Sequence, residues 1–555
     1  MRQPGACPAA NDGPIQRPET YPAANEDLDR VVSLGYAEKM TQEELRERFG
    51  DALRLPKIAV ISKIKEDGSK KVRLIVDMRR SGTNGMITIR ERLVLPRMTD
   101  LAESIVDVME GAAENEVELF AFDFRDAFYT MRIAECERRH VVAKGSSQFV
   151  AFQYVAFGLA SGPILWGRLA AATARFSQAI FRPQEFRVQT YVDDPAGIVR
   201  GTSSRQRSHL IVLYLLFVRV LGFELSWKKV QRGRQINWIG AKFQIRKEES
   251  SSTSSSSSGC VSGSENCTEE LVVTLSEEKA ATLKTALESI VTAGMVSSKK
   301  ALTVAGLASW AASVVPRARP FVAHLWGAIV DAKKDVGTVK ATTRSRPKDL
   351  IFVRRFHHAA CWLTELPRDD AALVRRFSPA IRRRPVDLTI RTDASPFGMG
   401  GILLENDGTV LGYWADELQD TDLKRFGACK GDPAYQSEWE FLAVLVSVAV
   451  FGNLPKNAKF RLQVDNTATL AAAMALKSPK PLMNAIAGEL SLRIDRLRTT
   501  LELAEHIPGL LNFIADALSR LSQGSAMPEV LSTGVRFPAV IRDDTFWSTW
   551  PQSWA

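Results

Sequence analysis

Two adjacent carboxylates lie between two stretches that have the pattern of β-strands. Asp193 and Asp194 separate residues 186–190 from residues 197–199, which predicts a hairpin with both acids at its tip. A third acid, Asp123, follows an apolar strand-like run. Three carboxylates from two neighbouring strands can hold two Mg²⁺ ions, which activate an attacking hydroxyl and neutralise the charge of a triphosphate. The chemistry predicted here is nucleotide addition.

A second group of acids lies in the last third of the chain. From residue 388 the sequence predicts three strands, a helix, a strand, a helix, a strand and a final helix. Acids lie on the first strand, the first helix, the fourth strand and the last helix: Asp393, Glu440, Asp465 and Asp516. Four such carboxylates can hold two metal ions that direct water at a phosphodiester.

Other predicted elements occur in a fixed order around Asp123, Asp193 and Asp194. A basic hairpin at residues 65–79 precedes Asp123, and the Gly-rich turn at residues 157–163 leads into a predicted helix at residues 164–181 before Asp193. This order resembles the fingers and palm of a retroelement reverse transcriptase over about residues 55–245. Pro195 departs from the family pattern and should restrict Asp194 to extended backbone.

The resemblance implies a role for each matching residue. Asp123 and Asp193 would be metal ligands, with Asp194 beside them. Phe128 would lie under the incoming sugar and exclude a ribose 2′-hydroxyl. The alternative role for this side chain is ordinary packing in the core. The resemblance also implies that four residues bind the nucleotide: Lys65, Arg73, Phe157 and Gly158. It makes Lys229 a candidate proton donor. The residues that would hold the primer are Trp238, Ile239 and Gly240.

Residues 385–521 resemble ribonuclease H. The resemblance makes Asp393, Glu440, Asp465 and Asp516 metal ligands, and His506 a mobile residue that helps the product leave. Glu438 competes with Glu440 for the ligand role, but residues two apart on a helix are rotated by about 200° and cannot both face the metals. The family pattern, an acid followed by Leu-x-Ala or similar, favours Glu440-Phe441-Leu442-Ala443.

The distribution of charge agrees with a nucleic-acid enzyme. The chain of 555 residues has a formal net charge of +10, and residues 299–391 hold 19 basic against 7 acidic residues. That segment therefore supplies the whole excess, as expected for a surface that lies along a nucleic-acid backbone. Its motifs at residues 302–310 and 314–321 look most like those of tyrosine-recombinase, or DIRS-type, retrotransposons.

We therefore predict an α+β multidomain chain with a right-hand polymerase followed by a ribonuclease H-like domain with a five-stranded mixed sheet. The predicted parts are a disordered segment at 1–45, fingers and palm at 46–247, a Ser-rich linker at 248–270, a basic helical thumb and connection at 271–385, the nuclease at 386–522 and a Trp-containing tail at 523–555. Six scattered cysteines, with neither a signal peptide nor a membrane segment in evidence, predict an intracellular protein in the cytoplasm or nucleus.

The predicted function is RNA-directed DNA polymerase with ribonuclease H activity. Its cofactor would be Mg²⁺, with Mn²⁺ possible, at two ions per active site. Its partners would be an RNA template, a DNA primer, the RNA/DNA hybrid and deoxynucleoside triphosphates, with no membrane. An inactive or domesticated descendant that only binds nucleic acid remains the alternative. An RNA-copying RNA polymerase would need neither Phe128 under the sugar nor a nuclease.

Overall fold

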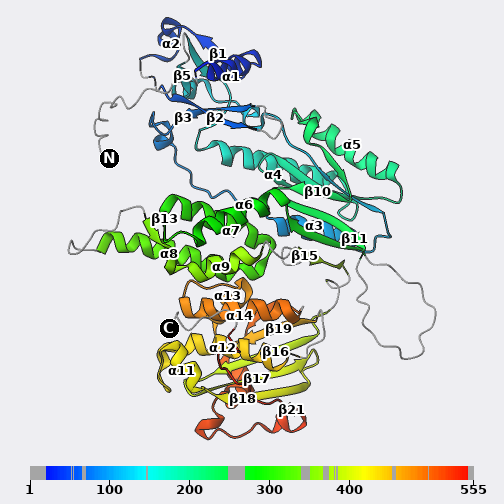
Figure 1. The fold of residues 1–555 in the computed structure, drawn as a ribbon. Helices are drawn as coiled ribbons and strands as arrows, with labels where there is room; N and C mark the ends of the chain where they lie inside the picture. The colour runs from blue at the N-terminus through cyan, green and yellow to red at the C-terminus, as the bar shows by residue number, and fades with distance from the viewer. Residues whose placement is uncertain are drawn as a thin grey trace. The chain divides into compact units, whose positions relative to one another are not determined.

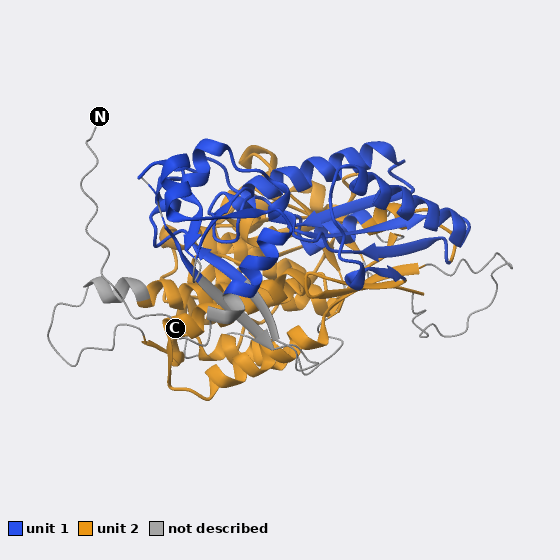
Figure 2. Cartoon of the chain, turned by 90° about the horizontal axis from the view of Figure 1, so that it is seen from above, with its two compact units in different colours: residues 1–104, 115–233 blue, residues 105–114, 234–555 orange. Residues whose placement is uncertain are grey.

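The computed structural model describes residues 21–51, 53, 55–64, 70–144, 148–247, 269–338, 350–366, 374–379, 382, 385–452, 458–497 and 499–547. The chain is a mixed α/β, multidomain protein with two compact units (Figure 2). Unit 1 comprises Met1–Ser104 and Asn115–Gly233, and unit 2 comprises Ile105–Glu114 and Arg234–Ala555. We find no helix in the described ranges with the length and hydrophobicity needed to cross a bilayer.

The centre of unit 1 is an antiparallel sheet in the order β7-β8-β4-β9, formed by β4 (Val117–Ala121), β7 (Phe186–Tyr191), β8 (Asp194–Arg200) and β9 (Gln231–Gly233). Figure 1 labels two helices of the same unit, α4 (Gly162–Ile180) and α5 (Ser204–Val220). Residues alternate along β7 between buried and half-buried, as in a strand with one face on a core. Helices α4 and α5 contribute to that core, which is rich in aromatic side chains, including Phe120, Phe186 and Tyr214.

A second part of unit 1 contains the predicted basic hairpin. Strands β2 (Lys57–Ile64) and β3 (Lys70–Asp77) pair antiparallel. A neighbouring sheet has the order β1-β6-β5, from Ala37–Met40, Phe149–Phe152 and Val142–Lys144. Short 3-10 turns at Ala127–Thr130 and Glu135–His140 connect these elements to the central sheet.

The prediction of disorder for residues 1–45 is wrong for the part that the structure describes. Helix α1 (Tyr21–Ser33) buries Leu28 and Val31 in the core that also holds Val76. Helix α2 (Gln42–Phe49) starts at Thr41 with a capping box. The spacing of the two apolar residues and the cap were signals of structure that the Pro- and Ala-rich composition of the segment obscured. Residues 1–20 lie outside the described ranges.

Unit 2 begins with a four-stranded antiparallel sheet in the order β10-β11-β12-β15. Its strands are Gln235–Trp238, Ala241–Lys247, Glu269–Leu275 and Val374–Phe377. The prediction assigned residues 234–247 to the palm, but they belong to unit 2, where β10 pairs with β11 and β11 pairs with β12. The Ser-rich linker was predicted at residues 248–270, and residues 248–268 of it lie outside the described residues.

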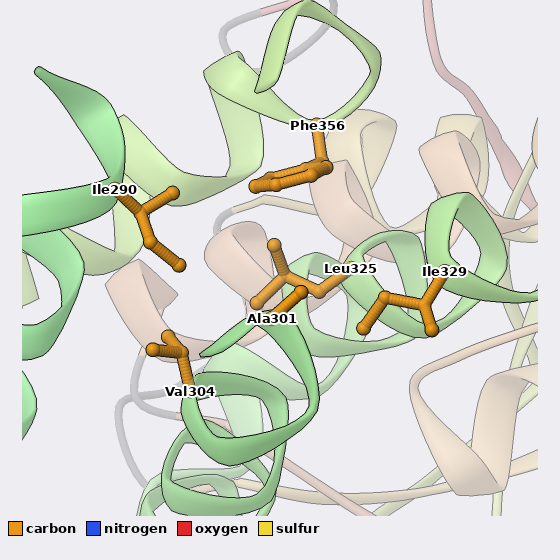
Figure 3. Close-up of a pocket in the computed structure, with 6 residues that line it drawn as sticks. All are labelled: Ile290, Ala301, Val304, Leu325, Ile329 and Phe356. Atoms are coloured by element: carbon orange, nitrogen blue, oxygen red, sulfur yellow. The ribbon is translucent and has the colours of Figure 1, made fainter. Parts of the chain in front are cut away.

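The predicted helical region consists of α6 (Glu277–Val291), α7 (Ser298–Val314), α8 (Arg319–Thr338) and α9 (His357–Glu365), with the short strand pair β13 (Met295–Ser297) and β14 (Leu350–Phe352). A small cavity among these helices has a wholly apolar lining (Figure 3), formed by Ile290, Ala301, Val304, Leu325, Ile329 and Phe356. With no polar group in its wall, the cavity has nothing to orient a polar ligand.

The last part of unit 2 is a mixed sheet in the order β20-β19-β16-β17-β18-β21. Strands β16 (Leu388–Ala394), β17 (Gly398–Glu405) and β18 (Val410–Glu417) form the predicted antiparallel meander, and β19 (Lys459–Val464) and β20 (Thr500–His506) lie parallel to β16. The prediction of five strands is wrong by one, because the short strand β21 (Val535–Arg536) pairs with β18.

Helices α12 (Gln436–Val450), α13 (Thr467–Ala475) and α15 (Phe513–Ser519) lie where helices were predicted. Helices α11 (Asp420–Phe426) and α14 (Pro481–Leu497) were not predicted. The N-terminal half of α14 is buried from Met483 to Ser491, and the helix shares a core with α12. A helix that is buried all round lacks the one-sided apolar pattern on which a sequence-based prediction depends.

The segment predicted as a tail packs on this six-stranded sheet as far as Trp547. Phe546 and Trp547 belong to the main core of this part of the chain. Arg542 is fully buried and ion-paired with Asp422 at 2.8 Å and with Asp416 at 2.6 Å. Burial raises the pKa of Asp422, which Arg542 opposes. The described part of this segment is therefore an integral piece of the fold.

Replacing Arg542 with Leu should lower the free energy of unfolding by about 3–5 kcal/mol, because it leaves the Asp422 carboxylate buried without its partner. Urea unfolding followed by fluorescence would measure the change. The double variant Arg542→Leu/Asp422→Leu should recover most of the loss. A double variant no more stable than the single one would mean that packing of the segment, and not the ion pair, carries the stability.

Candidate active sites

The hairpin β7–β8 presents two acids beside the end of β4. Tyr191 pairs with Asp194, so the loop consists of Val192 and Asp193. The backbone beyond β4 continues along this hairpin, since the Phe122 N–H donates to the Pro195 carbonyl at 3.0 Å and the Phe124 N–H to the Asp193 carbonyl at 2.8 Å. These bonds hold Asp123 next to Asp193 and Asp194.

The hairpin loop has a strained backbone that a buried side chain stabilises. Val192 has φ 53°, in the left-handed region that β-branched residues disfavour. The indole of Trp166, fully buried on α4, donates to the Val192 carbonyl at 2.6 Å. Pro195 pairs with Thr190 in regular register. The departure at Pro195 therefore leaves a tight two-residue loop intact.

Burial and like charge together perturb the pKa of one acid in this cluster. Burial, the charges of Asp193 and Asp123 and a hydrogen bond with Asp123 together raise the pKa of Asp194 to about 7, and Lys229 opposes this rise. Lys229 ends a 3-10 turn at Trp227–Lys229 and is ion-paired with Asp123. The Ser226 N–H donates to the Asp123 carbonyl at 2.9 Å, which ties that turn to the cluster.

The turn at Phe157 and Gly158 is joined to β3 by close backbone contact. The Val76 N–H donates to the Phe157 carbonyl at 3.0 Å. Gly158 has φ 114°, and a β-carbon there would lie 2.0 Å from the Val76 carbonyl oxygen, so the position requires glycine. The Asn84 side chain donates to the Gly158 carbonyl and accepts from the Ala160 N–H, both at 2.9 Å. Asn84 was not singled out from the sequence.

Phe128 is half-buried and contacts Phe157 edge to face, with ring centroids 5.1 Å apart. It packs against two hydrophobic cores of unit 1. Of the two predicted triphosphate ligands, Lys65 lies outside the described residues, and Arg73 lies on β3 opposite Ile61. Of the predicted primer-holding residues, Trp238 ends β10, and Ile239 and Gly240 form the turn to β11 in unit 2.

In unit 2, Asp393, Glu440 and Asp465 each place a carboxylate oxygen within 4.8 Å of the others. Asp393 lies on β16, and Asp465 directly follows the parallel neighbour β19. Glu440 reaches the same point from α12. Within the described ranges no other three acidic, His or Cys side chains come this close together.

Burial and mutual repulsion perturb the pKa values of Asp393 and Glu440. Burial and the neighbouring charges raise the pKa of Asp393 to about 7, although the Ser519 hydroxyl donates to it at 2.6 Å. Burial and the charges of Asp393 and Asp465 raise the pKa of Glu440 well above its usual range. Gln436 donates to one Glu440 oxygen at 2.9 Å, while the other oxygen is buried with no hydrogen-bond partner. Oxygen ligands with unused lone pairs fit a hard divalent cation such as Mg²⁺.

Glycines in β17 allow α15 to approach this cluster. A β-carbon at Gly400 would lie 2.4 Å from Leu518 Cβ, and one at Gly398 would lie 2.9 Å from the Ser519 carbonyl oxygen. The close packing brings Ser519 within hydrogen-bond distance of Asp393. The role of these glycines in seating α15 was not predicted from the sequence.

The other predicted nuclease residues lie around the three acids. The negative charge of Asp516 on α15 helps to raise the pKa of Asp393, and Asp516 is itself ion-paired with Arg520 at 2.7 Å. His506 is exposed at the end of β20, beside Val464. The loop after it approaches the cluster, since a β-carbon at Gly509 would lie 3.4 Å from Asp465 Oδ2. Glu438 is buried and is not one of the three converging acids; Lys480 Nζ lies 3.6 Å from its Oε1.

Neither a protein-family model nor a curated protein matches this sequence. Solved structures of a foamy viral protease-reverse transcriptase are similar at low identity. One in complex with double-stranded DNA is 13% identical with a TM-score of 0.43, and the match covers 91% of this chain and 73% of that one. Another in complex with an RNA/DNA hybrid is 11% identical with a TM-score of 0.42, covering 91% and 56% of the two chains.

The variants Glu440→Gln and Glu438→Gln test the register of α12. Glu440→Gln should stabilise the metal-free protein at neutral pH by on the order of 1 kcal/mol, because it removes one of three repelling charges. A raised carboxyl pKa in the folded state costs stability only above the ordinary carboxyl pKa, so the gain should vanish below about pH 4. Melting curves with and without MgCl₂ would measure both effects.

Glu438→Gln is the matched control. It should preserve any Mg²⁺-dependent rise in melting temperature, whereas Glu440→Gln should reduce it. The opposite pattern would assign the metal-facing side of α12 to Glu438.

Proposed function

We propose that this chain is an RNA-directed DNA polymerase with ribonuclease H activity that copies retroelement RNA into DNA and degrades the RNA of the hybrid. The observation that carries the proposal is the presence of two separate carboxylate clusters, one in each unit. Asp194 in the first, and Asp393 and Glu440 in the second, have strongly raised pKa values. Clusters of repelling buried acids cost stability and are typical of functional sites.

In the polymerase centre, Asp123 and Asp193 would hold two Mg²⁺ ions, or Mn²⁺ in their place, with Asp194 beside them. Such ions supply activation of the primer 3′-hydroxyl and neutralisation of the triphosphate. Lys65 and Arg73 would bind the triphosphate of the deoxynucleotide, as basic donors on a hairpin can. The hydrogen bond from the Val76 N–H to the Phe157 carbonyl supports a shared role for that hairpin and the Phe157 turn, since it joins the two segments.

In the nuclease centre, Asp393, Glu440, Asp465 and Asp516 would hold the metal ions that direct water at the RNA strand. The exposed ring of His506 would assist product release. Lys229 would donate a proton to the leaving group in the polymerase centre, and residues 238–240 would hold the primer end. The basic excess of residues 299–391 supports contact with the template, primer and hybrid backbones.

The motifs at residues 302–310 and 314–321 support a finer assignment. They lie on α7, on the 3-10 turn Pro316–Ala318 and at the start of α8. Their likeness to DIRS-type elements makes a retrotransposon the proposed source, and an intracellular location in the cytoplasm or nucleus follows from that source.

Separate active centres predict separable activities. Asp193→Asn should lower extension of a DNA primer on an RNA template by at least about a hundredfold while RNA cleavage in a preformed hybrid continues. Asp465→Asn should have the converse effect. Removing one ligand of a two-metal site takes away electrostatic stabilisation that no neighbour supplies. Extension and cleavage are measured on labelled primer and labelled RNA, each with Mg²⁺.

Each outcome discriminates between the alternatives. Loss of both activities in a single variant that still melts cooperatively would contradict two independent centres. Wild-type protein that binds the hybrid but neither extends nor cleaves it would favour the nucleic-acid-binding descendant.

Phe128→Ala tests how the polymerase would select its sugar. Removing the ring should raise incorporation of ribonucleotides relative to deoxynucleotides by about tenfold or more, since a relieved steric clash is worth on the order of 1–3 kcal/mol. Single-nucleotide extension with each triphosphate gives the ratio. Phe128→Tyr, which keeps the bulk, is the control. An unchanged ratio in Phe128→Ala would assign this side chain to core packing alone.

A further inference from the structure

Each carboxylate cluster contains a basic side chain that is ion-paired with one of its acids. In unit 1, Lys229 Nζ contacts Asp123 Oδ2. In unit 2, Arg520 Nε lies 2.7 Å from Asp516 Oδ1. Because both cations belong to the clusters themselves, they bear directly on how the clusters bind a metal ion.

Lys229 is positioned by the backbone next to its acid. The hydrogen bond from the Ser226 N–H to the Asp123 carbonyl places the turn that carries Lys229 beside the cluster. The Asp123 side chain is 11% exposed, whereas that of Lys229 is 53% exposed. The ammonium group can therefore leave toward solvent, while the carboxylate that it neutralises stays in place.

Arg520 has the same relation to the nuclease cluster. Asp393, Glu440 and Asp465 converge within 4.8 Å, and Asp516, the predicted fourth ligand, is the acid that Arg520 holds. Asp516 lies on α15, and Arg520 is the residue that directly follows this helix. Because the two residues are four apart on the chain, their side chains lie on the same side. Both side chains are about half exposed, which lets the pair open without disturbing the core.

Both cations act on the whole cluster as well as on their direct partner. The charge of Lys229 lowers the pKa of Asp194, and that of Arg520 lowers the pKa of Asp393. Carboxylates packed this closely in a partly buried site repel one another strongly unless a positive charge lies among them. In the metal-free protein these two side chains supply that charge.

We propose that Lys229 and Arg520 are resident cations, which neutralise the two clusters before metal loading and which Mg²⁺ must displace from Asp123 and Asp516. The inference rests on the proposed function only in taking both clusters as Mg²⁺ sites. Metal binding is then a competition between a divalent ion and a tethered monovalent group. Each cation, once displaced, is released beside the reacting phosphates, where a positive charge is useful.

The test is titration calorimetry of the full chain with MgCl₂ alone, without nucleotide or nucleic acid. A Glu440→Gln background weakens the nuclease centre and isolates the polymerase centre. There Lys229→Met should tighten Mg²⁺ binding by about threefold, which lies within the range for losing one partly exposed ion pair. Lys229→Arg keeps the charge and should bind as the wild-type residue does. An Asp193→Asn background isolates the nuclease centre for Arg520→Met, with the same expectation.

Two matched controls remove ion pairs elsewhere. Lys39 pairs with Asp29 at 2.7 Å, and Lys430 pairs with Glu417 at 2.5 Å, both near the surface. Lys39→Met and Lys430→Met should leave Mg²⁺ binding unchanged. Lys229→Gln carries the same expectation as Lys229→Met, so a folding defect of one variant does not decide the result.

The outcomes separate this inference from the proposed function. Unchanged or weaker Mg²⁺ binding in Lys229→Met and Arg520→Met, with binding by the parent proteins intact, would overturn the inference and leave the proposed function standing. Failure of the wild-type chain to bind Mg²⁺ at all would overturn the metal sites of the proposed function, and the inference with them.

Discussion

Repulsion between carboxylates held close together in partly buried positions is the constraint on which both candidate sites depend. Folding must bring these groups together although their charges oppose it, and here regular structure does so. Asp393 and Asp465 come from adjacent parallel strands, and Glu440 comes from a helix buried almost throughout. In unit 1 a two-residue hairpin loop and the end of β4 bring Asp193, Asp194 and Asp123 together. Rigid elements of this kind hold charges in place that a mobile loop would let separate.

The supporting contacts are mostly made by backbone atoms and small residues. Gly158 lets a turn touch β3, and Gly398 and Gly400 let α15 pack onto β17. The hairpin loop retains a left-handed valine, Val192, whose carbonyl is held by the buried Trp166. A left-handed β-branched residue is costly and persists where its surroundings hold it, which is common at functional sites. The local strain is therefore consistent with a loop shaped to present Asp193 and Asp194.

The sequence allowed the main strands and the carboxylates to be predicted, because strand alternation and acids at strand ends are local patterns. It did not reveal features that depend on contacts between distant residues. Helix α14 is buried on all sides in its first half and so lacks an amphipathic pattern. Arg542 and Trp547 look like parts of a charged and aromatic tail until their partners, Asp422 and the main hydrophobic core of the C-terminal part of unit 2, are known. The ion pair in unit 1 also depends on a distant contact, because Lys229 lies far along the chain from Asp123.

The predicted palm ends at residue 247, whereas unit 1 ends at Gly233. The hydrogen bonding of the strands explains this difference. Strand β9 pairs with β4, whereas β10 and β11 pair in sequence with β12. The boundary lies between Gly233 and Arg234, and Gly233 has φ 137°, a conformation open mainly to glycine. Residues 238–240 are thus fixed to the sheet that precedes the helices of unit 2. Any role they have at a primer end would follow the position of that sheet, and not that of the hairpin that carries Asp193.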